Sequence, residues 1–445
     1  MKVFLLNAER VLPQSVKVEC NTVSKTLRKM PPSAVIKILR KVFSLPAPAA
    51  RLILNDITRA RKEHKPWIHK IPKNDDWSGC WIGENVSKLD ADGLTQRIND
   101  ADIVFFYVHG GGFRIGTCTM YMDTNIAWIK ILKEKYNLNC MIMAIEYRLA
   151  PEHRYPSPVE DVVRAYEHLI QKIHVPSEKI IAIGDSAGAA LILEMLFITH
   201  DPSMFEIVTD DHGEAGNDPI LSELPRPAGT VLVSPIVTDQ TTSASWQTNV
   251  KHDYISQYTA KVIKRDYFEP ISSKSKEDGE EVNQILGIAK LQTGFTSFMP
   301  PQVLMYVGNL EVLRDDALDL ACKAEADGVL WKTIAEDCVH DWFCVREVVK
   351  DKSILARADQ TFADFCFNSV KSYFTTSMLN LRNDAGLEVV HEEDEEEEEE
   401  EDDDDFDSQD DQTTPSSSAL FGSFDSLRLS KVQLSKKDTS SMVFV

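Results

Sequence analysis

The chain has 445 residues, of which 43% are hydrophobic and 27% are charged, a balance typical of a folded globular protein. This length is enough for one large α/β domain with appendages. The formal net charge of −22 is uneven, because residues 392–411 hold 17 acidic and no basic side chains, whereas residues 1–391 hold 51 acidic and 44 basic ones. The main part of the chain therefore lacks the basic excess of a nucleic-acid-binding protein, and we expect no nucleic-acid partner.

The N-terminus and the cysteines indicate an intracellular protein. The apolar stretch at the N-terminus is too short for a signal peptide, and no uncharged apolar run approaches the ~18 residues of a transmembrane helix. The eight cysteines are scattered and form no CxxC pair, which favours reduced thiols and argues against a zinc site. We expect a cytoplasmic location, or one peripheral to the endoplasmic reticulum. The sequence makes no prediction of the oligomeric state.

Residues 24–74 form a basic segment that contains 13 Lys and Arg side chains and two acidic ones. Within it, "SAVIKILRKVFSL" (33–45) has apolar residues at helical spacing with basic residues between them, which predicts a basic amphipathic helix. A second helix is expected around residues 51–62. The basic face of these helices is either simply solvated or in reversible contact with an anionic membrane surface.

From Trp77 onward the pattern changes to short apolar strands separated by stretches long enough for helices. The expected strands are "IVFFYV" (103–108), "NCMIMAI" (139–145), "KIIAI" (179–183), "TVLVS" (230–234) and "QVLMYV" (302–307). Such alternation predicts an α/β fold with a parallel sheet covered on both faces. Residues 201–228 and 270–290 are polar and are expected to be loops.

The segment Gly184-Asp185-Ser186-Ala187-Gly188 lies between an expected strand and an expected helix. It is either a tight packing turn or a GxSxG nucleophile elbow, in which the serine stands at the end of the strand. The glycines would permit a turn too sharp for side chains at positions 184 and 188. Free N–H groups at the start of the following helix favour negative charge. The motif alone leaves both interpretations open.

Two further segments favour a nucleophile. His109-Gly110-Gly111-Gly112 directly follows the strand 103–108, and glycines at this place allow backbone N–H groups to converge on an oxyanion. A phosphate-binding loop is the alternative, but the GxGxxG spacing and the lysine of a P-loop are missing. His340 in "VHDWF" follows a short strand-like stretch late in the chain, which is where the general base belongs in hydrolases that carry a nucleophile elbow.

Together, HGGGF, GDSAG and "EYRLAPEHRYPSPVED" (146–161) resemble the hormone-sensitive-lipase-like branch of the α/β-hydrolases, which includes arylacetamide deacetylase and fungal steryl acetyl hydrolases. The resemblance covers roughly residues 77–350. It implies an α/β-hydrolase fold, with a mostly parallel central sheet, helices on both faces and a helical cap. It also implies Ser186 as nucleophile, His340 as base and no metal or organic cofactor. The implied oxyanion hole comprises the N–H groups of Gly110, Gly111, Gly112 and Ala187, with motif support from His109, Gly184, Asp185 and Gly188.

The triad acid is where the sequence departs from the family. Members carry an aspartate three residues after a glycine that follows a strand, and the matching position here is Glu311, three residues after Gly308. A glutamate can orient the histidine and stabilise its charged form. Asp315 matches a second acidic position of the family and is the fallback acid.

The resemblance predicts a carboxylesterase or deacetylase that works through an acyl-enzyme. The expected substrate is a small lipophilic ester with a short acyl group on a bulky alcohol, a steryl acetate being one candidate. Two other classes stay open. The chain could be a ligand-binding protein on the same fold with a degenerate triad, or an interaction protein that binds its partners through the acidic tail.

The expected domain organisation has three parts. Residues 1–75 form the basic helical cap region, residues 76–375 form the catalytic domain with a cap insertion at about 238–290, and residues 376–445 form a disordered acidic and Ser-rich tail. The tail could fold back onto the basic cap and screen the entrance to the site.

Overall fold

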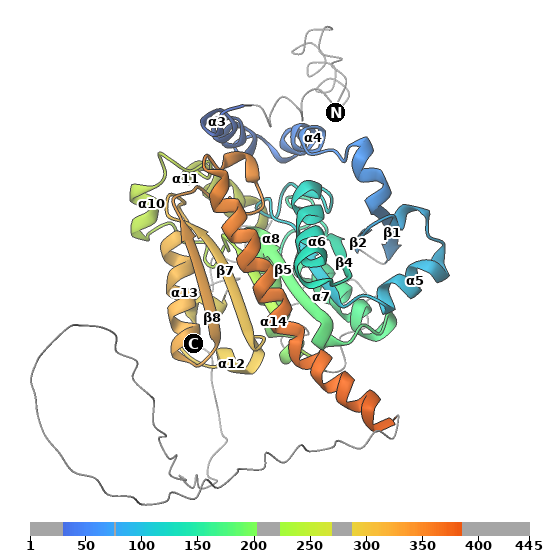
Figure 1. The fold of residues 1–445 in the computed structure, drawn as a ribbon. Helices are drawn as coiled ribbons and strands as arrows, with labels where there is room; N and C mark the ends of the chain where they lie inside the picture. Colours follow the sequence, from blue (N-terminus) through green and yellow to red (C-terminus); the bar gives the residue numbers. More distant parts are fainter. Residues whose placement is uncertain (1–29, 75–76, 203–222, 269–286, 385–445) are drawn as a thin grey trace, which may run out of the picture. The chain divides into compact units, whose positions relative to one another are not determined.

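The computed structural model describes residues 30–74, 77–202, 223–268 and 287–384 (Figure 1). In chain order, the helices and strands of these residues are α3 (Pro32–Phe43), α4 (Ala47–Ile57), β1 (Ile68–Asn74), β2 (Trp77–Ile82), α5 (Ala91–Asn99), β3 (Ile103–Val108), α6 (Met122–Tyr136), β4 (Cys140–Glu146), α7 (Ser157–Glu167), β5 (Ile180–Asp185), α8 (Ala187–His200), β6 (Gly229–Val233), α10 (Ala244–Thr248), α11 (Gln257–Ile263), α12 (Phe295–Phe298), β7 (Gln302–Gly308), α13 (Arg314–Ala326), β8 (Leu330–Glu336) and α14 (Lys352–Asp384).

The strands form an eight-stranded sheet with the order β1-β2-β4-β3-β5-β6-β7-β8. The six strands from β4 to β8 in this order are parallel to one another. At the other edge, β2 runs antiparallel to both of its neighbours, β4 and β1. All five strands predicted from their apolar runs are present. Because the parallel strands run in one direction, their carboxyl ends meet at the same edge of the sheet, where binding sites of such folds lie.

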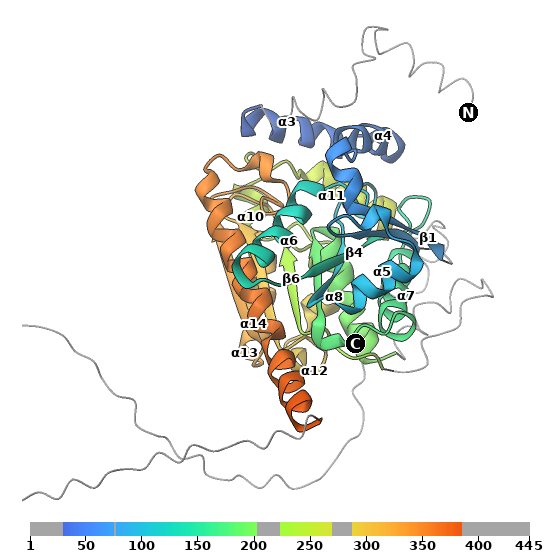
Figure 2. The same ribbon diagram turned by 45° about the vertical axis from the view of Figure 1, so that its right-hand side comes forward.

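Helices cover both faces of the sheet, as two consecutive residues of β3 show. The Phe105 ring lies 5.8 Å from that of Phe362 in α14, whereas the Phe106 ring lies 5.4 Å from that of Tyr166 in α7. Neighbouring residues of a strand point to opposite faces, so α14 and α7 lie on opposite sides. α6 packs beside α14, and α8 packs beside α7 (Figures 1 and 2).

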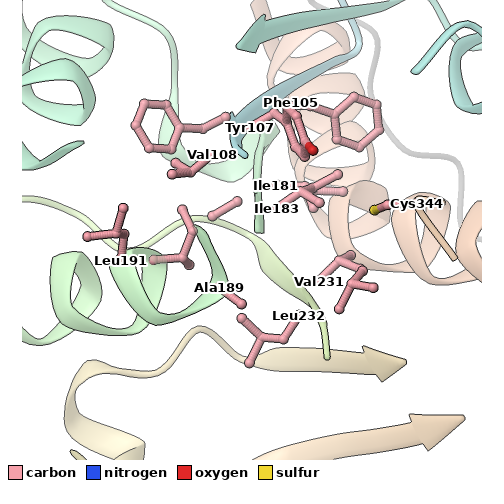
Figure 3. Packing of buried hydrophobic residues seen from close by; sticks show 14 of the residues in the cluster. Phe105, Tyr107, Val108, Ile181, Ile183, Ala189, Leu191, Val231, Leu232 and Cys344 are labelled. Atoms are coloured by element: carbon pink, nitrogen blue, oxygen red, sulfur yellow. The ribbon is translucent and has the colours of Figure 1, made fainter. Parts of the chain in front are cut away.

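The core fills the space between these layers. Ile181 and Ile183 of β5, Val231 of β6 and Leu191 of α8 are fully buried, and Figure 3 shows their side chains gathered between the strands and the helices. Burial of β5 on both faces explains why its sequence is a continuous apolar run rather than an alternating one. The strand that leads to Ser186 is thus held rigidly at the centre of the sheet.

The N-terminal helices α3 and α4 lie side by side at one end of the described fold (Figures 1 and 2). α4 begins earlier than the predicted residue 51, because Pro46 is its N-cap and a proline stands in its first turn, where proline suits a helix. A buried ion pair of 2.7 Å joins Arg114, beside the glycine loop, to Asp266 of the insertion. The side chain of Arg51 in α4 donates to the Arg114 carbonyl at 2.7 Å, so the cap helices are tied to the same loop.

Two expected boundaries differ from the structure. The segment 1–75 was expected to be helical, but its end forms β1, an edge strand whose residues alternate without an apolar run. The tail was expected from residue 376, but α14 continues to Asp384. The rest of the tail, the residues before 30 and most of the two predicted loops lie outside the described residues. Within the described part, no helix is both long and apolar enough to cross a membrane.

Candidate active site

Ser186 stands at the turn between β5 and α8, at the carboxyl edge of the sheet. Its backbone has φ 50° and ψ −113°, a conformation that non-glycine residues rarely adopt. Such local strain persists where the surrounding structure enforces it, and it is common at functional sites. The side chain is almost buried, with 4% of its surface exposed.

The two glycines of the elbow permit this turn for steric reasons. A Cβ atom at Gly184 would lie 2.5 Å from the backbone of Gly188, and one at Gly188 would lie 2.1 Å from the carbonyl oxygen of Val108. Both distances are far shorter than carbon and oxygen atoms allow. The start of α8 therefore packs directly against the end of β3, which brings Ser186 beside the glycine loop.

His340 lies in the loop after β8, and its Nε2 is 2.9 Å from Ser186 Oγ. Burial of the imidazole lowers its pKa to about 3, so the ring is neutral at neutral pH. A neutral Nε2 can accept the hydroxyl proton of Ser186. The predicted nucleophile and base, 154 residues apart in the chain, are thus within hydrogen-bond distance.

Glu311 follows β7 and is fully buried, with Oε2 3.8 Å from His340 Nδ1. This distance is too long for a hydrogen bond. The same oxygen accepts a 2.6 Å hydrogen bond from the hydroxyl of Ser234, which directly follows β6. Burial raises the pKa of Glu311 to about 8, with the Ser234 hydrogen bond opposing and the negative charge of Asp253 adding to the shift.

Asp315 has a different position and different partners. Its carboxylate accepts from the backbone N–H of Ser245 in α10 at 2.7 Å and pairs with Arg314 at 2.8 Å. These contacts join α13 to α10 of the cap insertion. The structure brings Glu311, and not the fallback Asp315, to the histidine.

The glycine loop after β3 lies beside Ser186. Gly111 has φ +115° and Gly112 has φ +60°, so both need the conformational freedom of glycine. The backbone hydrogen bonds of this loop in the described structure run from the N–H groups of Arg114 and Ile115 to the Gly111 carbonyl. The N–H groups of Gly111 and Gly112 donate none of them.

His109 and Asp185 both contact the glycine loop at Gly110. His109 is fully buried, donates from Nδ1 to the Gly110 carbonyl at 2.7 Å and stacks on the Tyr147 ring at 4.5 Å. Asp185 accepts a 2.7 Å hydrogen bond from the Tyr107 hydroxyl, and burial raises its pKa to about 7. A Cβ atom at Gly110 would lie 2.3 Å from the Asp185 carboxylate, so the loop and the elbow are in close contact.

Asp253, in the cap insertion, is a site residue that the sequence reasoning missed. Its fully buried carboxylate accepts from the backbone N–H of Val312 at 2.8 Å and from that of His340 at 3.4 Å. It therefore connects the loop that carries Glu311 to the loop that carries His340. Burial raises the pKa of Asp253 to about 7. No local pattern marks this residue, because its partners come from distant segments.

Asp341 and Tyr254 complete the surroundings of the histidine. Asp341 Oδ2 lies 3.3 Å from His340 Nε2, and its backbone N–H donates to the Ser234 hydroxyl at 3.0 Å. Burial and the neighbouring carboxylates raise the pKa of Asp341 well above its usual range. The Tyr254 ring meets the imidazole edge to face at 5.4 Å. Of these residues, Ser234 could have been predicted from the sequence, because it directly follows the parallel strand β6.

Two neighbouring cavities lie at this site. The serine cavity, of about 40 Å³, is bounded by Ser186, His340, Gly112, Ile255, Trp246 and Phe43. The cap cavity, of about 110 Å³, is bounded by Gly111, Tyr254, Leu39, Leu54, Met122 and Phe43. Within the described residues, no group of three or more His, Cys, Asp or Glu side chains is arranged to hold a metal ion.

Comparisons with known proteins agree with this fold. A family profile described as the alpha/beta hydrolase fold matches residues 105–344. An esterase of Acinetobacter venetianus is 26% identical over 225 residues, which cover 50% of this chain and 61% of that protein. Lipase 2 of Moraxella sp. is 24% identical over 324 residues, which cover 68% of this chain and 69% of that protein. A crystal structure of an esterase from the bacterial hormone-sensitive lipase family superposes with a TM-score of 0.54 at 23% identity, covering 76% of this chain and 98% of the other.

Proposed function

The chain belongs to the alpha/beta-hydrolase-fold family, and from this premise we propose that it is a serine carboxylic ester hydrolase that acts through an acyl-enzyme. The proposal rests on one observation above all. Ser186 Oγ lies 2.9 Å from the Nε2 of a buried, neutral histidine, at a strained turn on the carboxyl edge of the sheet. The names of the curated relatives, an esterase and a lipase, support the same class of reaction.

In the acylation step, Ser186 Oγ attacks the ester carbonyl carbon while its proton passes to Nε2 of His340. The carbonyl π electrons move to the oxygen, which becomes the tetrahedral oxyanion. The N–H groups of Gly111, Gly112 and Ala187 are the proposed donors to this oxyanion, and one such donor typically contributes about 3 kcal/mol to transition-state stabilisation. Collapse of the intermediate releases the alcohol, which takes its proton from His340.

Deacylation repeats these steps with water as the nucleophile. His340 takes a proton from the water, the hydroxide adds to the acyl carbon, and the Ser186 oxygen leaves with the proton returned by the imidazole. The carboxylic acid is the second product. Both half-reactions require His340 to alternate between its neutral and charged forms.

Glu311 is the proposed group that stabilises the charged histidine. At 3.8 Å its Oε2 is within Coulomb range of Nδ1, and a shortening of about 1 Å would form a hydrogen bond. Catalytic hydrogen bonds are often longer in the ligand-free enzyme than in the transition state. Ser234 and Asp253 are the proposed positioning residues, since one holds the Glu311 carboxylate and the other connects the acid and base loops.

The serine cavity favours an ester with a short acyl group. About 40 Å³ accommodates roughly three water-sized groups, which corresponds to an acetyl or propionyl chain. Much of the cavity wall is apolar, including Ile255, Ile263 and Trp246, and this supports a lipophilic ester. A steryl acetate remains one candidate substrate.

A fluorophosphonate probe and a series of p-nitrophenyl esters test the proposal on the full chain. The probe should label the wild type at Ser186 and leave Ser186→Ala unlabelled, and that variant should lose turnover of p-nitrophenyl acetate. Retained turnover in the variant would refute the assignment. An unlabelled wild type would instead support the alternative of a binding protein with a degenerate triad.

A further inference from the structure

Phe43, the last residue of α3, lies between the two cavities. In the described residues it is the side chain common to both, and 9% of its surface is exposed. Its ring lies 5.5 Å from that of Tyr254, which in turn packs against the imidazole of His340. The phenyl ring is therefore one aromatic layer away from the catalytic base.

The backbone on both sides of Phe43 completes a partition. Gly112 faces the serine cavity, and its neighbour Gly111 faces the cap cavity. In the same way Ile255 faces the first cavity, and Tyr254 faces the second. Two pairs of consecutive residues thus have one member on each side, so these two segments form part of the wall between the cavities.

The cap cavity has the walls of a site for an aliphatic chain. One part of its wall is formed by apolar side chains of α3 and α4, among them Val35, Ile38, Leu39 and Leu54, and Met120, Met122 and Val345 add further apolar surface. At one end, Arg61, His64 and Asp123 contact one another, with Arg61 2.7 Å from His64 Nε2. These three polar groups partner one another, and Thr58, Arg59 and Glu347 add further polar atoms to the wall. The rest of the wall is mostly aliphatic or aromatic, which suits an aliphatic chain.

We propose that the cap cavity is a binding site for an extended acyl chain and that the Phe43 ring keeps it separate from Ser186. This inference rests on the proposed esterase function and states which residue limits the length of the acyl chain. With Phe43 in place, the acyl group is confined to the serine cavity. Without the ring, a volume of about 110 Å³ is added, which corresponds to roughly eight water-sized groups.

The test compares kcat/KM for p-nitrophenyl acetate and p-nitrophenyl octanoate in the full chain. The wild type should prefer the acetate, and Phe43→Ala should raise the octanoate-to-acetate ratio by about tenfold or more, since even single methylenes are discriminated by about that factor. Phe43→Leu removes less volume, serves if the alanine variant fails to fold, and should shift the ratio in the same direction.

Two further variants make the result specific. Phe298→Ala removes a buried phenylalanine from α12, at the end of the fold opposite α3, and should leave the ratio unchanged (Figure 1). Adding Leu39→Trp to Phe43→Ala should refill the cap cavity and reverse most of the gain on octanoate. Labelling by a short fluorophosphonate checks in each variant that Ser186 is still reactive.

The outcomes separate this inference from the proposed function. An active wild type that hydrolyses octanoate as well as acetate, or a ratio that moves equally in the Phe43 and Phe298 variants, would overturn the chain-length proposal alone. A failure of Leu39→Trp to reverse the gain would show that the chain takes another route. A wild type inactive on all esters and unlabelled would overturn the esterase assignment itself.

Discussion

Replacing Glu311 by glutamine keeps the shape of the side chain but prevents it from becoming negatively charged. The proposed role of this charge is to stabilise the protonated His340 that forms in both half-reactions. Oε2 and Nδ1 are 3.8 Å apart. At an effective dielectric constant of about 20, two unit charges at this distance attract by about 4 kcal/mol. Loss of that attraction in the transition state lowers kcat about 10³-fold.

The pH modulates this effect because burial raises the pKa of Glu311 to about 8. A carboxyl group of this pKa is about one-tenth ionised at pH 7 and about nine-tenths ionised at pH 9. The kcat/KM of the wild type should therefore rise about tenfold between pH 7 and pH 9, while that of Glu311→Gln should stay flat. The ratio between the two enzymes grows from about 10² to about 10³ over this range.

The assay is p-nitrophenyl acetate hydrolysis with Ser186→Ala as the blank at each pH. Asp315→Asn is the matched control, because it also neutralises a carboxylate of the same segment, but one that bonds Ser245 and Arg314. We expect Asp315→Asn to keep kcat within about tenfold of the wild type. An equal loss in both variants, or a pH-dependent limb that survives in Glu311→Gln, would refute the assignment of the acid.

Three further predictions concern the loop, the cap and the stability. Gly111→Ala should lower kcat by about 10²-fold or more, since φ is +115° and the Cβ would meet a carbonyl oxygen at 2.0 Å, whereas Gly294→Ala, with open space around it, should keep its activity. Arg114→Met removes the buried partner of the Asp266 carboxylate, which then keeps only the exposed Arg265 as its cation, and should lower the free energy of unfolding by about 1–3 kcal/mol in urea titrations, with Asp266→Asn in the same chain recovering part of it. Because burial raises the pKa of Glu311 from its ordinary value of 4.5 to about 8, the free energy of unfolding should fall as the pH rises between these two values, and chemical denaturation of Glu311→Gln should show a flatter pH dependence.

The parallel part of the fold was predictable because burial on both faces leaves its mark on local sequence. "IVFFYV" is apolar at every position, and every residue of β3 is buried. The edge strand β1 could not be found in this way, since "IHKIPKN" lies at the border of the sheet and mixes charged, polar and proline residues. Its strand character comes from pairing with β2, which is a tertiary property.

The residues of the candidate site likewise fall into those that local sequence indicates and those that depend on tertiary contacts. Ser186 and the glycine loop directly follow strand ends and carry motif glycines, and His340 comes four residues after β8, so local sequence indicated them. Glu311 was indicated by the family resemblance, because it occupies the acid position three residues after Gly308. Asp253 and Phe43 could not be found, since each acts through contacts with loops far away in the chain, and an apolar residue in a helix is usually part of the core.

The order of the strands gives the nucleophile and the base unequal mechanical support. β5, which carries Ser186, has partners on both sides, β3 and β6, whereas β8, which precedes His340, pairs with β7 alone. Strands at the rim of a sheet open more readily than central ones, because fewer backbone bonds must break. As the protein is warmed, the rim can therefore detach while the centre still holds its native hydrogen bonds. Heating would therefore abolish the activity at a lower temperature than it unfolds the domain, because His340 would leave while Ser186 is still in place.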